Sequence, residues 1–150
     1  MQVIRPWLVL GKYQETLDLP LLQAQNIGAM LQFAEPVLQP AIPTLYIPLT
    51  DGTPITREVF RQGLDFILTH HEAGKKVFVS CGAGISRSVT FVVAALKETE
   101  NTTLLEAYKS VLQVQARALP HPVLWQSLST YYGENTPYWQ LLKQYNRAAL

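Results

Sequence analysis

One stretch of the chain decides the fold: Lys76-Val77-Phe78-Val79-Ser80-Cys81-Gly82-Ala83-Gly84-Ile85-Ser86-Arg87-Ser88-Val89-Thr90-Phe91-Val92-Val93. Its first part is a short apolar run of β-branched and aromatic residues, which predicts a buried strand. Apolar residues resume at length after Ser88, and this second run predicts a helix. A glycine-containing turn therefore joins the end of a strand to the start of a helix.

The turn has the composition of an anion-binding site. Glycines at 82 and 84 allow backbone conformations that other residues resist, so several N–H groups can point into one concavity. Unpaired N–H groups and the helix dipole both favour a phosphate-like ligand at the start of a helix. The only formal positive charge in the turn is Arg87, whose guanidinium suits two oxygens of a phosphoryl group.

Cys81, the only cysteine in the chain, lies six residues before Arg87. The same N–H groups and the guanidinium would favour its thiolate form, which is the nucleophilic form of cysteine. The other interpretation is a buried, inert cysteine with a surface arginine nearby, because cysteine is often buried. The Cys-x(5)-Arg spacing alone does not decide between the two, but the complete strand, glycine turn and helix favour a nucleophile beside an oxyanion site.

Residues 80–88, called the signature loop below, resemble the signature loop of the cysteine-dependent protein tyrosine phosphatases, and residues 83–88 look most like the dual-specificity branch. The resemblance implies that Cys81 is the nucleophile and that the hydroxyl of Ser88 donates to its sulfur. It also implies a phosphate-binding loop made of Gly82, Ala83, Gly84, Ile85, Ser86 and Arg87. Ser86 is expected to contribute through its backbone N–H.

Two positions depart from the family pattern. The family usually has histidine immediately before the nucleophile, where this chain has Ser80, which cannot carry charge. We therefore expect a less strongly stabilised thiolate and slower turnover. His121 and Leu124 stand where the family usually has asparagine and an aromatic residue, and we expect this second change to affect bracing of the loop rather than its chemistry.

Phosphoryl transfer to a thiolate also needs a proton donor for the departing oxygen. Asp51 is the candidate, because it follows a predicted strand and lies 30 residues before Cys81, about where the family places its general acid. An Asp-Gly turn is also common without any chemistry. The rivals Asp65 and Glu58 are better explained as a charge on a solvated helix face and as a residue favoured by the helix dipole.

The pattern of the whole chain predicts an α/β fold. Strands are expected over 2–5, 8–10, 29–33 and 44–47, and in the run that ends at Cys81. In the first part of the chain, one helix is expected from Asp18 to near 26–28 and a second from Thr53 or Thr56 to Gly74. Four more helices are expected later: from the signature loop to about Glu98, after a capping box at Thr103, from Pro122, and from Pro137. Strands separated by helices predict a central, mostly parallel sheet of about four to five strands, in three layers with helices on both faces, as in protein tyrosine phosphatases. The strand ending at Cys81 should be central.

Composition limits the class of protein. The chain has 150 residues, of which 48% are apolar, so we expect one dual-specificity phosphatase-like catalytic domain over 1–150. A net charge of +1 predicts no general attraction to nucleic acid or to membranes. The lone thiol, the lack of a long apolar run and the lack of a secretory signal pattern predict a cytoplasmic location. No cysteine or histidine spacing suggests a metal, and we expect no cofactor.

The function expected from the resemblance is hydrolysis of phosphate monoesters through a phosphocysteine on Cys81. The expected partners are phosphorylated proteins or peptides, carrying phosphotyrosine and often phosphoserine or phosphothreonine, with phosphate, sulfate or vanadate as active-site anions. One alternative is a catalytically impaired module that binds phosphorylated partners, for which Ser80 is the supporting feature. A phosphatase for a non-protein phosphate ester is a second alternative, although the signature loop has no lysine. Rhodanese-type sulfurtransferases and low-molecular-weight phosphatases fit less well in loop length or in the order of acid and nucleophile.

Overall fold

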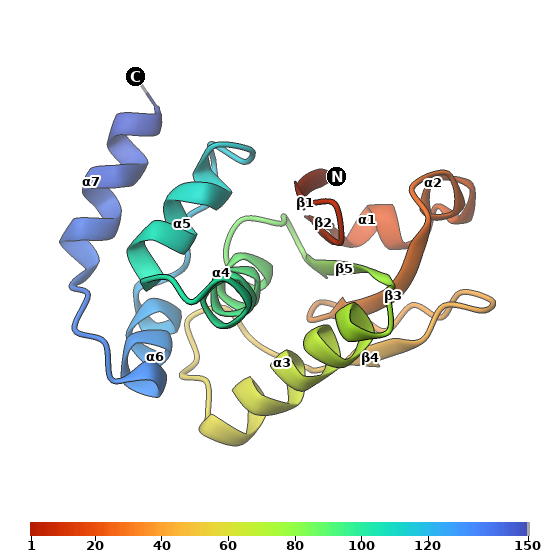
Figure 1. The fold of residues 1–150 in the computed structure, drawn as a ribbon, viewed down its shortest axis with the longest axis horizontal. Helices are drawn as coiled ribbons and strands as arrows, with labels where there is room; N and C mark the ends of the chain where they lie inside the picture. Colours follow the sequence, from red (N-terminus) through yellow and green to blue (C-terminus); the bar gives the residue numbers. More distant parts are fainter. Residues whose placement is uncertain (150) are drawn as a thin grey trace.

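The computed structural model describes residues 1–149, which are arranged around a five-stranded sheet (Figure 1). The strands are β1 (Gln2–Arg5), β2 (Leu8–Lys12), β3 (Ile27–Gln32), β4 (Thr44–Tyr46) and β5 (Lys76–Cys81). They lie in the order β1-β2-β5-β3-β4, and every neighbouring pair is parallel except β1 and β2. The predicted mostly parallel sheet, with the strand of Cys81 at its centre, is confirmed.

Seven helices are described: α1 (Tyr13–Thr16), α2 (Leu19–Ala24), α3 (Arg57–Glu72), α4 (Arg87–Glu100), α5 (Leu104–Leu112), α6 (Pro122–Tyr132) and α7 (Tyr138–Ala148). The long helices α3 and α4 cover one face of the sheet, while the short helices α1 and α2 lie on the other side (Figure 1). Helices α5, α6 and α7 gather beyond α4, away from α2. The three predicted layers are present, but they are unequal in size.

The two faces of β5 explain this inequality. Successive side chains of a strand point to opposite faces, so Val77 and Val79 belong to the main core beneath α3 and α4. Phe78, between them, belongs to a smaller cluster with Val9 and Met30, which Leu22 of α2 covers. Both faces of the central strand are therefore buried, which fits the continuous apolar run in its sequence.

Helix α4 is buried along most of its length. All nine residues of 88–96 are buried, because neighbouring helices and the sheet surround them. A helix that is apolar on all sides is stable only in the interior of a protein. This burial fixes the position of the start of α4, where the signature loop ends, relative to the sheet.

The predicted helix caps are confirmed. Of the two candidates for the start of α3, the N-cap is Thr56, whose hydroxyl accepts a hydrogen bond from the backbone N–H of Val59 at 3.2 Å. The capping box of α5 forms as predicted, with the Thr103 hydroxyl accepting from the backbone N–H of Glu106 at 3.1 Å. These short polar pairs satisfy N–H groups that have no partner within their own helices.

Several predicted boundaries are wrong. The second strand was expected over 8–10, but β2 continues through Gly11 to Lys12, because Gly11 pairs in register with Ser80 of β5. The predicted helix end near 26–28 is wrong as well, because α2 ends at Ala24; the strand expected over 29–33 accordingly begins earlier, and β3 covers residues 27–32. The turn between them uses Asn26, whose φ of 56° is a conformation that asparagine tolerates better than most residues.

A further correction concerns the acid candidate. The strand before Asp51 was expected to include Ile47, but β4 ends at Tyr46. The backbone N–H of Ile47 still donates to the carbonyl oxygen of Gln32 in β3 at 2.9 Å, but Pro48 has no N–H with which to continue the ladder. Asp51 thus lies in the loop between β4 and α3 rather than directly at a strand end.

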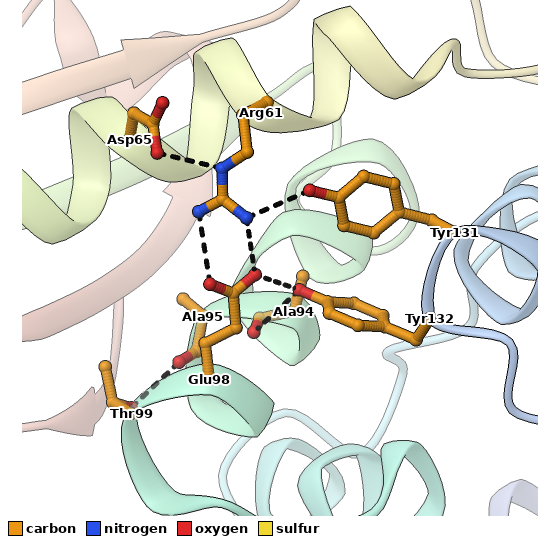
Figure 2. A network of polar contacts seen from close by, with 8 residues as sticks. All are labelled: Arg61, Asp65, Ala94, Ala95, Glu98, Thr99, Tyr131 and Tyr132. Carbon is orange, nitrogen blue, oxygen red and sulfur yellow. Dashed lines mark hydrogen bonds and ion pairs between the residues drawn. The ribbon is translucent and has the colours of Figure 1, made fainter.

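A polar network joins helices α3, α4 and α6 (Figure 2). Arg61 of α3 donates two hydrogen bonds of 3.1 Å to Glu98 of α4 and one of 2.9 Å to the hydroxyl of Tyr131. The Tyr132 hydroxyl donates to the same Glu98 carboxylate, and Asp65 accepts from Arg61 at 2.9 Å. The network links the helix that follows the Asp51 loop to the helix that follows the signature loop.

Candidate active site

Cys81 is the last residue of β5, and its side chain points to the main core face of the sheet. The residue is 2% exposed, and its Sγ lies 3.0 Å from the Oγ of Ser88, which is fully buried in the first turn of α4. The signature loop thus turns back on itself, so that a residue seven positions later in the chain contacts the sulfur. The predicted pairing of the two side chains is present.

The turn requires glycine at position 84. Gly84 has a φ of +72°, in the left-handed region that side chains disfavour. A Cβ atom there would lie 2.7 Å from the carbonyl oxygen of Gly11 in β2, which is too close for any side chain. The signature loop therefore packs its backbone directly against a neighbouring strand.

Arg87 folds back over the loop. A Cβ atom on Gly82 would lie 3.1 Å from Nη2 of Arg87, so the guanidinium lies beside the backbone just after Cys81. Its Nη1 donates to the carbonyl oxygens of Leu49 at 2.8 Å and Phe33 at 3.3 Å. These two carbonyls follow β4 and β3, so the arginine is held by the carboxyl edge of the sheet. One end of the guanidinium is anchored, which leaves its other N–H groups directed to the loop.

Asp51 approaches the same loop from the β4–α3 connection. Its Oδ1 accepts a 2.6 Å hydrogen bond from the hydroxyl of Ser86. The backbone N–H of His121 donates to that same hydroxyl oxygen at 2.9 Å. The tertiary structure therefore brings the predicted acid to the signature loop through a side-chain hydroxyl, whereas the sequence suggested only a backbone contribution from Ser86.

One cavity of about 370 Å³ contains these groups. It is lined by Asp51, Cys81, Ala83, Ile85, Ser86, Arg87, Leu119, Pro120, His121, Pro122 and Tyr138. The predicted nucleophile, cation and acid share this cavity, together with three of the predicted phosphate-binding positions. Gly82, Gly84 and Ser88 do not line it: Ser88 is buried behind the sulfur, and Gly84 is buried against β2.

The cavity is also lined by residues that were not among the predicted site residues, of which His121 and Tyr138 carry polar groups. His121 precedes α6, and its Nδ1 accepts from the backbone N–H of Val123 at 3.1 Å, which caps that helix. Tyr138, in the first turn of α7, packs against the main core and also lines the cavity, where its hydroxyl donates to the carbonyl oxygen of Pro120 at 2.6 Å. Burial and the nearby Asp51 carboxylate raise the pKa of Tyr138. No local motif marks Tyr138, because only the packing of α7 brings it there.

The rival acids lie outside this cavity. Asp65 pairs with Arg61 in the helix network, and Glu58 is exposed in the first turn of α3.

A larger groove of about 600 Å³ also has Pro122 in its lining and lies between the Asp51 loop and α6, but none of its lining residues is a cysteine. Within residues 1–149, no cluster of three or more His, Cys, Asp or Glu side chains could hold a metal ion. No helix in the same range is long and apolar enough to cross a bilayer.

The geometry supports a specific kind of chemistry. A cysteine sulfur, an arginine and a carboxyl group surround one cavity large enough for a phosphoryl group and an attached aryl ring. A thiolate nucleophile beside a guanidinium is suited to attack on a tetrahedral oxyanion, and a carboxyl group can supply a proton to the leaving group. The arrangement therefore matches the chemistry expected from the sequence.

Comparison with known proteins agrees with the geometry. Residues 8–147 match the family model of the dual specificity phosphatase catalytic domain. Human dual specificity protein phosphatase 5 is 31% identical over 138 residues, which cover 89% of this chain and 36% of that protein. The chain thus spans about a third of the length of this curated relative. Phosphatidylglycerophosphate phosphatase PTPMT1 of Arabidopsis thaliana is 33% identical over 75 residues, or 50% of this chain and 22% of that protein.

A solved structure has the same fold. The human tyrosine phosphatase-like serine/threonine/tyrosine-interacting protein superposes with a TM-score of 0.80 at 28% identity. The match covers 89% of this chain and 95% of the human chain. The sheet and its helices are thus shared with it over nearly their full extent.

Proposed function

Because the chain belongs to the family of dual specificity phosphatase catalytic domains, we propose that it hydrolyses phosphate monoesters through a phosphocysteine formed on Cys81. The observation that carries this proposal is the shared cavity, where Asp51 from the β4–α3 loop meets Cys81 and Arg87 from the two ends of the signature loop. We propose that residues 1–150 form one catalytic domain that needs no metal or cofactor. A free reactive thiol favours the reducing cytoplasm as its location.

The first step transfers the phosphoryl group to sulfur. The Cys81 thiolate attacks phosphorus in line with the ester oxygen, so an S–P bond forms while the P–O bond breaks. Backbone N–H groups of residues 82–87 and the Arg87 guanidinium hold the three equatorial oxygens. The electron pair of the broken bond stays on the departing oxygen, and the carboxylic acid of Asp51 gives that oxygen its proton.

The second step reverses the proton transfer. The Asp51 carboxylate now takes a proton from a water molecule, whose oxygen attacks phosphorus and displaces the sulfur. The hydroxyl of Ser88, 3.0 Å from Sγ, donates to the sulfur as it regains negative charge. Inorganic phosphate leaves, and the enzyme returns with Cys81 as thiolate and Asp51 protonated.

We propose phosphorylated proteins or peptides as the substrates, with phosphotyrosine as the first class to test. The cavity is lined by apolar side chains from Ile85, Leu119 and Pro120 around its polar base, a surface that suits an aryl ring. Phosphoserine and phosphothreonine are the second class, and phosphate, sulfate and vanadate are the expected competing anions. A non-protein phosphate ester is a further candidate, because a relative over half of the chain is a phosphatidylglycerophosphate phosphatase.

Turnover of p-nitrophenyl phosphate tests the activity. The wild-type protein is expected to release p-nitrophenol and to be inhibited by vanadate. Cys81→Ser should abolish turnover while vanadate still binds, and acid quenching of the wild type should trap phosphate on the Cys81 peptide. A panel of phosphotyrosine, phosphothreonine and phosphatidylglycerophosphate substrates then ranks the classes.

The second candidate function is a module that binds phosphorylated partners without turnover. Two observations favour it: Ser80 replaces the usual histidine, and a phosphatase-like interacting protein shares the fold at 28% identity. A wild-type protein that binds phosphopeptide but turns over neither that peptide nor p-nitrophenyl phosphate would establish this function and refute the enzymatic one.

A further inference from the structure

The hydroxyl of Ser86 joins two segments that the sequence places far apart. It donates to Oδ1 of Asp51 at 2.6 Å, and it accepts from the backbone N–H of His121 at 2.9 Å. All three residues line the same cavity. The contact from His121 is reinforced two residues earlier, where the backbone N–H of Leu119 donates to the carbonyl oxygen of Ile85 at 2.7 Å.

The direction of the hydrogen bond to Asp51 follows from counting hydrogens. A serine hydroxyl has one hydrogen and two acceptor lone pairs. The N–H of His121 can only donate, so it occupies one lone pair of the Ser86 oxygen. The single hydrogen of Ser86 is then free to point to Oδ1 of Asp51, and the backbone of the 119–122 segment fixes that orientation.

We propose that Ser86 is the positioning residue for the general acid. This inference rests on the proposed function, in which Asp51 exchanges a proton with the leaving group and with water. Because the Ser86 hydrogen is directed to Oδ1, that oxygen acts as an acceptor, and the acid proton belongs on the other oxygen, Oδ2. The hydroxyl thereby selects one of the two carboxyl oxygens and holds the loop of Asp51 against the signature loop.

This role differs from that of the other loop residues. Arg87 and the loop N–H groups contact the phosphoryl oxygens, and Ser88 contacts the sulfur. The hydroxyl of Ser86 is directed to Asp51 and not to the phosphoryl group, so removing it should weaken proton donation, while the backbone N–H of residue 86 remains and phosphate binding stays intact. That distinction can be measured, because proton donation matters most when the leaving group is a strong base.

The test uses a series of aryl phosphates, from phenyl phosphate with a poor leaving group to 2,4-dinitrophenyl phosphate with a good one. Values of kcat/KM are measured for the wild type, Asp51→Asn, Ser86→Ala and Ser86→Thr. Asp51→Asn should lose roughly a hundredfold or more on phenyl phosphate and far less on the dinitrophenyl ester. Ser86→Ala should follow the same trend with a loss of roughly ten- to a hundredfold on phenyl phosphate. Ser86→Thr, which keeps a hydroxyl, should recover most of it.

Two controls separate positioning from damage to the fold. Vanadate affinity should be unchanged in Ser86→Ala, because the phosphate-binding groups remain. In the double variant Asp51→Asn with Ser86→Ala, the loss should equal that of Asp51→Asn alone, since the hydroxyl of Ser86 acts only through the acid. Ser129→Ala removes a buried hydroxyl of α6 outside the cavity and should leave the whole series unchanged.

Three results would overturn the inference. Equal losses on every aryl phosphate in Ser86→Ala would mean that the hydroxyl only shapes the phosphate loop. Additive losses in the double variant would mean that Ser86 and Asp51 act independently. A flat leaving-group response in Asp51→Asn would remove Asp51 as the acid, and with it this role of Ser86. Absence of turnover in the wild type would instead refute the proposed phosphatase activity itself.

Discussion

The Oγ of Ser88 lies 3.0 Å from the Sγ of Cys81, and the protein buries both residues almost completely. A hydroxyl this close stabilises sulfur when the sulfur carries negative charge, and a hydrogen bond to a charged group contributes about 1.5–3 kcal/mol. Water cannot replace the hydroxyl easily in so buried a place. The pair therefore ties the first turn of α4 to the chemistry at the end of β5.

Ser88→Ala should slow breakdown of the phosphocysteine more than its formation. Loss of the hydrogen bond predicts a kcat lower by roughly ten- to a hundredfold. Rapid mixing with p-nitrophenyl phosphate should then reveal a burst of p-nitrophenol, because the second step becomes limiting. A loss of kcat/KM as large as the loss of kcat, with no burst, would contradict this assignment.

Arg87→Lys should fail to replace the arginine. The guanidinium reaches the carbonyl oxygens of Leu49 and Phe33 while its other N–H groups face the loop. An ammonium cannot span these positions, so we expect kcat/KM to fall by roughly a hundredfold or more and vanadate affinity to weaken. Arg57→Lys is the matched control, because Arg57 lies over the Tyr131 ring outside the cavity. Equal effects of the two variants would refute the prediction.

Tyr138→Ala should weaken binding of aryl phosphate substrates. Its ring forms a wall of the cavity, and an aromatic contact of about 0.5–1.5 kcal/mol predicts a KM for phosphotyrosine peptide that is roughly two- to tenfold higher. The KM for a phosphothreonine peptide should change less, and Tyr138→Phe should keep most of the preference. Trp139→Ala, on the same helix but 61% exposed, is the control. Equal changes for both peptides would show that the ring does not contact substrate.

Glu98→Ala should destabilise the fold without changing the active site. Glu98 accepts from Arg61 and from the Tyr132 hydroxyl, and its loss leaves both donors without this partner (Figure 2). We expect a cost of about 1–3 kcal/mol in urea unfolding. The control is Glu100→Ala on the same helix, whose more exposed pair with Arg5 should cost less than about 1 kcal/mol. Equal costs would mean that the network contributes little.

Alkaline pH should destabilise the folded protein, in part because buried tyrosines ionise more easily in the unfolded chain. Burial, and to a lesser extent the neighbouring tyrosines, raises the pKa of Tyr108, which is fully buried and donates to the carbonyl oxygen of Ala118. The unfolded chain loses this proton near pH 10 while the folded protein keeps it, so the contribution is full below about pH 10 and declines above it. Above that pH, each buried tyrosine of this kind lowers the free energy of unfolding by about 1.4 kcal/mol per pH unit. In Tyr108→Phe, urea midpoints between about pH 9 and 11 should fall less steeply, and an unchanged slope would contradict this origin.

Much of the fold could be predicted because its signals are local. The apolar run before Cys81 and the caps at Thr56 and Thr103 depend on neighbours within a few residues, and all three agree with the structure. Boundaries set by tertiary pairing were missed instead. β2 runs through Gly11 because its partner Ser80 is in register there, and no local pattern shows that pairing.

The sequence by itself determined the kind of chemistry, because a cysteine, two glycines and an arginine can be recognised together in one turn between a predicted strand and a predicted helix. Only the tertiary structure decided how the proton donor is held and what shapes the pocket. Asp51 meets Ser86, and Tyr138 enters the cavity, through contacts between segments separated by tens of residues. Such contacts form when helices pack on a sheet to bury apolar surface, and packing has no periodic signature in the residues that it brings together.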